Sequence, residues 1–309
     1  MLDYHVHLWP HSERADSLQF ELERLAGYCD RAGKAGVSEI ALTEHLFRFR
    51  GAREMLGAFW LDEPNEALRD YMGAYWDHHA TADLDDYVAA VIAAKQAGLP
   101  VLLGLEVDYY PGRMDDVAAL LAGYPFDVLL GSVHWIGTWM FDIPESPAQM
   151  AEWDRQGTDE AWRSYTETLE ELAATRTCDV LAHPDLVKIL GRRPPAALLD
   201  ECEERMAAAA AGSGMSAEIS SVGWKRPVGE QYPSRTLLGK FRQRGVTVTT
   251  ASDSHGPHAV GARSADLFDV ASSAGYTSLR AFRARKGSEV PLQPPAPVSE
   301  GPAEAEIAT

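Results

Sequence analysis

The chain alternates short apolar runs with longer helix-like segments, and this alternation constrains its fold more than any other feature. Continuous apolar runs of this length are typical of parallel strands that are buried on both faces. Strands that alternate with helices indicate an α/β fold with a parallel sheet, and seven of them favour a barrel of seven strands rather than eight. The predicted strands are Leu2–Leu8, Glu39–His45, Val101–Tyr109, Val128–Trp135, Val180–Asp185, Ser216–Ser221 and Thr247–His255.

The segments between these strands predict helices, several of which end at a glycine that suits a left-handed C-cap. The clearest are Ser17–Ala35, Asp83–Ala97, Met114–Leu121, Asp159–Ala174, Pro195–Ala211 and Ser234–Arg244. Residues 46–84 form a long insertion that is rich in aromatic side chains and arginine. Residues 290–309 are rich in Pro, Ala and Glu, and we expect a disordered tail there. A single domain over residues 1–289 follows.

Composition narrows the classes of function. Hydrophobic residues make up 46% of the 309 residues, so a sizeable core can form. Asp and Glu number 46 against 28 Lys and Arg, which gives a net charge of −18 and disfavours nucleic acid and anionic membranes as partners. The three cysteines form no CxxC pair, and the N-terminus carries neither a basic region nor a long apolar run. We therefore expect a cytoplasmic protein with reduced thiols, and the oligomeric state stays open.

Histidine is concentrated at the predicted strand ends. Of the ten histidines, only His78, His79 and His258 lie away from these ends. The C-terminal ends of parallel barrel strands meet on one face, so residues far apart in sequence come together there. The third strand adds Glu106, and the seventh adds Asp253 two residues before its histidine. Imidazoles and carboxylates are ligands that suit zinc, manganese or iron, so this face is predicted to bind metal.

The order of these motifs along the chain resembles the PHP (polymerase and histidinol phosphatase) family. The motifs are His-x-His at 5–7, Thr-Glu-His at 43–45, an isolated Glu106, Ser-Val-His at 132–134, Ala-His-Pro-Asp at 182–185 and Ser-Asp-Ser-His at 252–255. Segments 131–142 and 226–234 are most similar to the histidinol-phosphatase branch. The resemblance covers most of residues 2–260 and implies a single distorted (β/α)7 barrel that holds three divalent transition-metal ions, Zn, Mn or Fe.

The resemblance also implies which residues bind each metal. The first metal would be held by His5, His7, Glu106 and Asp253, and Glu106 would bridge to a second metal completed by His134 and His183. The third would be held by His11, His45 and His255. At position 11 the spacing from the first motif is shorter than is usual in the family, so Glu13 and Asp16 remain competitors.

The implied reaction is attack of a metal-bound hydroxide on phosphorus, with Glu106, Asp253 and His255 as catalytic residues. Cations of the protein should also contact the phosphate. Lys188 and Arg226 are predicted for this role because each closely follows a strand-end motif. Two further carboxylates, Asp108 and Asp185, are candidates for orienting ligand histidines, and surface or helix-cap roles are equally open to them.

These features predict a metal-dependent phosphomonoesterase whose partner is a small phosphate ester. The branch resemblance favours L-histidinol phosphate, which is cleaved to L-histidinol and phosphate. Its ammonium and imidazole groups would need the carboxylates and aromatics predicted at the rim, which are Asp142, Glu230, Trp135 and Trp139. The alternatives are another ester, such as a nucleotide or cyclic phosphate, and a metal-binding accessory module without turnover. Insertion 46–84 leaves the barrel directly after His45, so it is predicted to cover the catalytic face as a lid.

Overall fold

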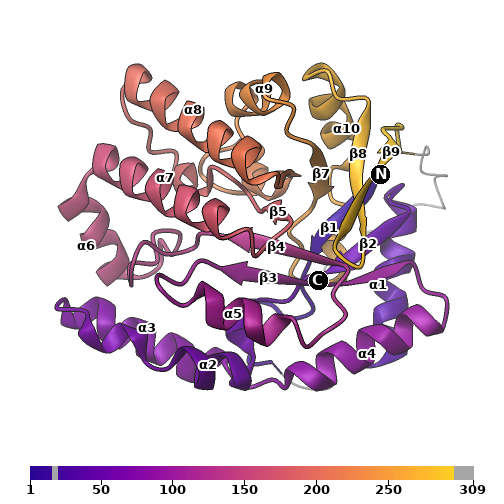
Figure 1. Cartoon of the computed structure of the whole chain (residues 1–309), viewed down its shortest axis with the longest axis horizontal. Coiled ribbons are helices and arrows are strands. Elements are labelled where there is room, and N and C mark those ends of the chain that lie inside the picture. Colours follow the sequence, from indigo (N-terminus) through magenta and orange to yellow (C-terminus); the bar gives the residue numbers. More distant parts are fainter. Residues whose placement is uncertain (16–19, 296–309) are drawn as a thin grey trace, which may run out of the picture.

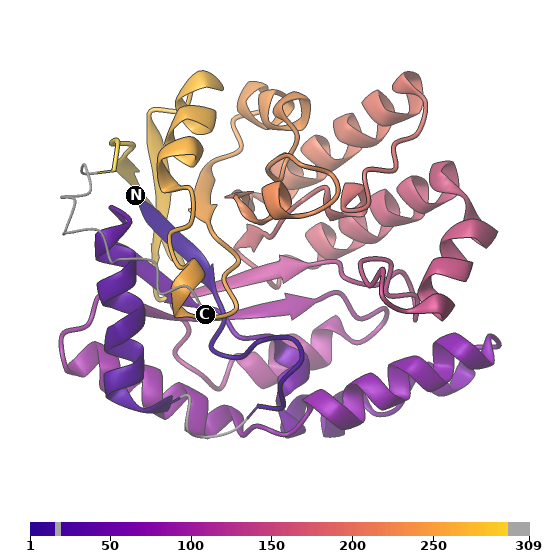
Figure 2. The same ribbon diagram turned by 180° about the vertical axis from the view of Figure 1, so that it is seen from behind.

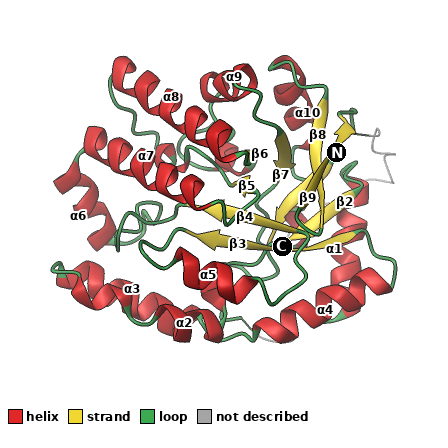
Figure 3. Ribbon diagram, in the orientation of Figure 1, coloured by secondary structure: helices red, strands yellow, loops and turns green. Residues whose placement is uncertain are grey.

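Seven parallel strands form the centre of the molecule and follow one another in sequence order around a barrel (Figure 3). The computed structural model describes residues 1–15 and 20–295, and its strands confirm all seven predicted ones. Each observed strand ends earlier than predicted, which leaves most of the strand-end motifs in the loops that follow. The strands are β1 (Leu2–Val6), β2 (Glu39–Leu42), β3 (Val101–Asp108), β4 (Val128–Ser132), β5 (Val180–Leu181), β6 (Ser216–Ser220) and β7 (Val248–Ala251).

The seam between β1 and β7 nearly closes the barrel. Val6 and Ser254 form a parallel bridge, and the backbone N–H of His7 donates to the Ser254 carbonyl at 2.7 Å. Asp3 fixes the same seam from inside, because its buried carboxylate accepts from Ser252 N at 2.8 Å, Ser252 Oγ at 2.6 Å and Gly261 N at 2.8 Å. One carboxylate of β1 thus binds the segment that directly follows β7 and holds the two ends of the barrel sheet together.

Helices cover the outside of the barrel (Figures 1 and 2). Those that follow strands are α1 (Leu22–Lys34), α4 (Leu84–Gln96), α5 (Met114–Leu121), α6 (Pro147–Gln156), α7 (Thr158–Thr175), α8 (Ala196–Ser213), α9 (Arg235–Gln243) and α10 (Ser264–Ser273). The short 3-10 turns η4 (Leu186–Lys188), η5 (Val222–Lys225) and η6 (Pro257–Ala259) lie in three of the loops. The predicted helices are confirmed except for the start of the first, which lies outside the described residues. Within the described ranges, no helix has the length and apolar character needed to cross a membrane.

The insertion folds into two helices and two short turns, which extend along the side of the barrel as far as the ends of β3 and β4 (Figure 1). Its elements are η2 (Leu46–Arg48), α2 (Arg50–Leu56), η3 (Phe59–Asp62) and α3 (Glu66–His79). Asn65 caps α3 by accepting from Ala67 N at 3.1 Å, as expected for an N-cap side chain.

The last strand runs slightly past the boundary predicted at residue 290. A hairpin of β8 (Ser278–Arg283) and β9 (Lys286–Pro291) follows α10, so the fold continues through Pro291. The hairpin tip docks on the barrel through Arg285, whose Nε donates to Asp179 Oδ2 at 2.6 Å. Residues 296–309 of the predicted tail lie outside the described residues.

The seam predicts a stability effect. Replacing Asp3 by Asn keeps the shape but puts an amide donor where the carboxylate accepts, so at least one buried N–H or O–H of Ser252 or Gly261 loses its partner. An unsatisfied buried donor costs about 1–3 kcal/mol. We expect Asp3→Asn to lower the free energy of unfolding by about that amount in urea denaturation. The matched control, Asp30→Asn on the exposed face of α1, should change it by less than about 0.5 kcal/mol.

Candidate metal centre

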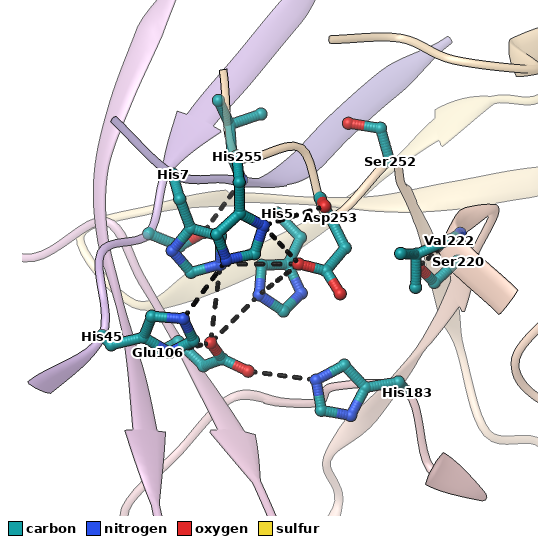
Figure 4. Close-up of polar contacts among 12 residues, drawn as sticks. His5, His7, His45, Glu106, His183, Ser220, Val222, Ser252, Asp253 and His255 are labelled. Carbon is teal, nitrogen blue, oxygen red and sulfur yellow. Dashed lines mark hydrogen bonds and ion pairs between the residues drawn. The ribbon is translucent and has the colours of Figure 1, made fainter. Parts of the chain in front are cut away.

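The predicted site residues meet where the C-terminal ends of the barrel strands converge. The side chains lie around a common centre, although they come from five different strands or the loops after them (Figure 4). Those drawn together there are His5, His7, His45, Glu106, His183, Asp253 and His255. His134 lies beside them, with its ring centroid 5.0 Å from that of His183.

Glu106 lies at the middle of this group and is fully buried. Its Oε2 faces one set of rings, at 2.6 Å from His45 Nδ1 and 3.2 Å from His5 Nε2. Its Oε1 faces another, at 3.1 Å from His183 Nε2 and 3.5 Å from His134 Nε2. One carboxylate therefore connects two groups of imidazoles, which is the arrangement expected of a residue that bridges two cations.

The other ligand candidates lie on the side of Glu106 Oε2. Asp253 Oδ1 is 3.6 Å from His7 Nε2 and 3.8 Å from His5 Nε2. His7, His45 and His255 offer nitrogens that all lie within 4.8 Å of one another.

His11 reaches this group from the exposed rim, where its ring stacks on His255 with centroids 3.9 Å apart. Of its two competitors, Glu13 does not line the cavity that opens above these residues, and Asp16 lies outside the described residues.

Several buried polar atoms in this centre have no well-formed hydrogen bond within the described part of the chain. They are His5 Nε2, His7 Nε2, His45 Nδ1, Glu106 Oε2 and His183 Nδ1. Leaving such atoms unpaired is unfavourable, and native structures rarely do so. Imidazole nitrogens and carboxylate oxygens within coordination range are the donor set of a divalent transition metal. The residues present therefore fit metal ions.

Two carboxylates outside this group orient its rings. Glu218 Oε2 is 2.8 Å from His5 Nδ1, and Asp108 Oδ1 is 2.7 Å from His134 Nδ1, so the Nε2 atom of each ring faces Glu106. The contact of Asp108 matches its predicted role. Glu218 was not predicted, and a lone glutamate within a buried strand is the signal that could have found it.

The ionisation states favour metal binding. Burial opposes the charged form, but His5 and the other neighbouring imidazoles together outweigh it and hold the pKa of Glu106 and Asp253 well below the usual range. Burial, together with nearby imidazoles, lowers the pKa of His45 and His255 well below its ordinary value. The carboxylates are thus anionic and these two rings are neutral, which is the form in which each group binds a metal.

Two candidate ligands have strained backbones. His183 has a φ of 28° and Asp253 a φ of 51°, in the left-handed region that non-glycine residues rarely adopt. Each follows a strand closely, and the unusual turn directs its side chain back over the barrel. Strain of this kind costs about 1–3 kcal/mol and is concentrated at functional sites.

Arg48 joins the insertion to the loop that carries His11. Its guanidinium is fully buried and donates to the Glu13 carbonyl at 2.6 Å and the Pro10 carbonyl at 2.9 Å. It also lies 3.3 Å from Nδ1 of His79, at the end of α3. Burial and the nearby Arg48 lower the pKa of His79 to about 3, so this ring is neutral and accepts.

A cavity of about 540 Å³ opens above the metal centre. The insertion forms one wall with Phe47, Tyr71, Tyr75, His78 and His79. The loops after β4 and β6 contribute Met140, Asp142, Ile143, Glu145 and Arg226. The volume is within the usual range for small-molecule sites.

Several predicted contact residues lie elsewhere. Lys188 is fully buried, and its ammonium contacts Asp185 at 2.8 Å, Glu230 at 2.5 Å and the Gln231 carbonyl at 2.9 Å. These oxygens surround the ammonium, and Lys188 does not line the cavity, so the structure does not bring it to the position predicted for a phosphate contact. Asp185 accepts from Ser234 N at 2.7 Å, and no hydrogen bond joins it to His183, whose Nδ1 has no partner within the described residues.

The aromatic residues at the rim also differ from the prediction. Trp135 and Trp139 are buried in the core and do not line the cavity, whereas the tyrosines of α3 do. Glu230 faces Lys188 and Arg193 instead of the cavity. Arg226 and Asp142 do line it, as predicted.

The barrel and its strand-end ligand set define the class of protein. The family model described as "PHP domain" matches residues 3–221, and the chain belongs to this family. It is 32% identical over 271 residues to the "Probable histidinol-phosphatase" of Deinococcus radiodurans, with 84% of this chain and 90% of that one covered. A protein of the same name from Schizosaccharomyces pombe is 25% identical over 169 residues, covering 52% of this chain and 55% of that one.

The fold is shared with a solved histidinol phosphate phosphatase from Lactococcus lactis, crystallised with zinc, L-histidinol and phosphate. The two structures superpose with a TM-score of 0.63 at 20% sequence identity, and 93% of this chain and 98% of that one are covered. The likeness confirms the predicted (β/α)7 barrel of the PHP type.

The role of Arg48 can be tested directly. Arg48→Met removes the guanidinium and leaves buried carbonyls of the His11 loop without donors, so we expect a loss of about 3–5 kcal/mol in unfolding free energy. Limited proteolysis should also become faster at residues 9–15. The control is Arg53→Met, whose partner Asp77 is exposed, and it should cost less than about 1 kcal/mol. Equal effects of the two substitutions would contradict a special role for Arg48.

Proposed function

We propose that this protein is a metal-dependent phosphomonoesterase that hydrolyses L-histidinol phosphate to L-histidinol and phosphate. The observation that carries the proposal is the buried Glu106 carboxylate, whose two oxygens face separate groups of imidazoles. The named relatives support it, because the Deinococcus protein covers most of this chain at 32% identity. A complete ligand set of this kind argues against a metal-binding module without turnover.

Three divalent metal ions fit the donor atoms. His5, His7, Glu106 and Asp253 would hold the first, and Glu106, His134 and His183 the second. The third would be held by His11, His45 and His255. When bound, such ions supply Lewis acidity, which lowers the pKa of water and neutralises phosphate oxygens. The bridging position of Glu106 would keep the first two cations close together in spite of their mutual repulsion.

Arg226 is the cation of the cavity that we assign to the phosphate. It is exposed on the 226–234 segment and lines the cavity together with Asp253 and His255. A guanidinium can contact two phosphate oxygens at once, which fixes the orientation of the ester.

The carboxylates of the cavity suit the cationic part of the substrate. Asp142 and Glu145 line the cavity, and Asp142 Oδ1 is buried without a hydrogen-bond partner within the described residues. We assign Asp142 to the substrate ammonium. Tyr71 and Tyr75 of α3 would pack against the imidazole ring, and the insertion would exclude water as a lid once substrate is bound.

Replacing Glu106 tests the bridging role. Glu106→Gln keeps the shape of the side chain but removes the negative charge shared by two cations, so both should weaken together. We expect kcat/KM to fall by about 100-fold or more, which exceeds the usual cost of losing an orienting partner. Elemental analysis should show the loss of two metal equivalents, whereas Glu13→Gln should keep them all. Loss of a single equivalent would contradict bridging.

Substrate specificity gives a second test. With manganese added, kcat/KM for L-histidinol phosphate should exceed that for nucleoside monophosphates and cyclic phosphodiesters by tenfold or more. Preference for a nucleotide or cyclic ester would favour that alternative class, and no turnover of any ester would favour the accessory module.

Asp142→Asn should lower kcat/KM for histidinol phosphate by about 10–100-fold, because a charged hydrogen bond is worth about 1.5–3 kcal/mol. The same substitution should change kcat/KM for 4-nitrophenyl phosphate, which has no ammonium, by less than threefold. The control Asp159→Asn, on the exposed face of α7, should leave kcat/KM for both substrates unchanged.

A further inference from the structure

A second cavity, of about 410 Å³, lies at the opposite end of the barrel. It opens where β5, β6 and β7 begin, whereas the metal centre lies where the strands end. In Figure 1 the arrowheads of β3 and β4 point away from the β8–β9 hairpin, which forms one side of this cavity. Among the residues that the structure describes, its charged lining consists of Arg176, Arg244, Arg280, Arg285 and one carboxylate, Asp179. We call it the arginine cavity.

The charge of the arginine cavity contrasts with that of the whole chain. Four guanidinium groups and one carboxylate give its lining a formal charge of +3 (4 − 1), in a protein whose net charge is −18. The helices α7, α8 and α9 end at its edge, and each C-terminus carries about −0.5 of partial charge. Together with Glu204, which pairs with Arg244, they offset about 2.5 of these positive charges. A small positive balance of about +0.5 remains on the lining.

The four arginines differ in how many contacts their guanidinium groups make with the rest of the protein. Arg285 contacts Asp179 and also donates to the Thr177 carbonyl at 2.7 Å, so it anchors the hairpin. Arg244 pairs with Glu204 on α8. Arg176 makes one long contact, 3.4 Å, to the Gly212 carbonyl. Each still has guanidinium N–H groups that these contacts do not use, because a guanidinium carries five.

Arg280 is the arginine that the described fold leaves without a partner. Its cross-strand neighbour is Glu289, yet the two form no ion pair, and Glu289 accepts from Ser278 Oγ at 2.9 Å instead. Arg280 lies over Gly287, where an added Cβ would be 2.1 Å from its Nε. Because Gly287 has no side chain, the guanidinium of Arg280 can lie over it at the edge of the cavity.

We propose that the arginine cavity is a binding site for a small anion that carries phosphate groups. Planar guanidinium groups match the geometry of phosphate oxygens. Ser216 and Thr247 bond each other through their hydroxyls at 2.7 Å, so one O–H of this pair remains to donate to a ligand. The volume exceeds that of one phosphate ion, so the ligand is a phosphorylated small molecule bound through its phosphate. This proposal does not depend on the proposed function, because it uses none of the residues of the metal centre.

The experiment is calorimetric titration of inorganic phosphate into the metal-loaded enzyme. We expect two binding events, one of which matches the inhibition constant of phosphate against turnover. The second event belongs to the arginine cavity. Arg280→Gln should weaken it by tenfold or more and leave the inhibition constant within twofold. The control Arg155→Gln, which removes an exposed arginine on α6, should leave both events unchanged.

A second variant keeps every charge in place. Gly287→Ala puts a methyl group where Arg280 lies, so the guanidinium must move, and the second event should weaken in the same direction. It also serves if Arg280→Gln fails to fold, which thermal unfolding would show. A single binding event that matches inhibition would overturn the proposal, as would a second event that both variants keep at full affinity. Neither result bears on the metal centre, whose failure would instead appear as absent turnover.

Discussion

The charge of Glu106 is the constraint on which the rest of this structure depends. A carboxylate with no exposed surface is unfavourable unless cations or donors surround it. Here the neighbours are imidazoles from β1 and from the loops after β2, β4 and β5, so the strands must end at matching heights for the group to form. The barrel seam serves the same requirement, since Asp3 and the Val6–Ser254 bridge bring Asp253 beside His7.

The part of the site that could be predicted follows from topology. Parallel strands end on one face, so histidines at strand ends had to converge, and His5, His134 and His183 do. Contacts that depend on the direction of a side chain after a turn could not be predicted. Lys188 and Arg226 both follow strand-end motifs, but η4 turns Lys188 inward to Asp185 whereas Arg226 stays exposed on the cavity.

The β8–β9 hairpin escaped prediction for a local reason. A two-residue hairpin turn with positive φ at both positions is usually marked by Asn or Gly. Here the turn residues are Ala284 and Arg285, with φ of 47° and 65°, so the usual signal is missing. Contacts with the barrel stabilise the turn instead, because Ala284 N donates to Asp127 Oδ1 at 3.2 Å and Arg285 contacts Asp179. Tertiary contacts of this kind cannot be found in a local sequence pattern.

Charge balance also couples the metal centre to protons. Burial opposes protonation of His134, but Asp108 and Glu106 outweigh it and raise the pKa of this ring to about 10 in the metal-free chain. The pKa of His5 is likewise raised, against burial, by Glu218 and Glu106. Protons on these rings therefore balance the carboxylates when no metal is present. Asp108 and Glu218 hold the Nδ1 atoms, so the proton that a metal must displace is the one on Nε2, facing Glu106. The same two carboxylates thus orient the rings for a metal and stabilise the protons that compete with it, so metal affinity must fall as the pH falls.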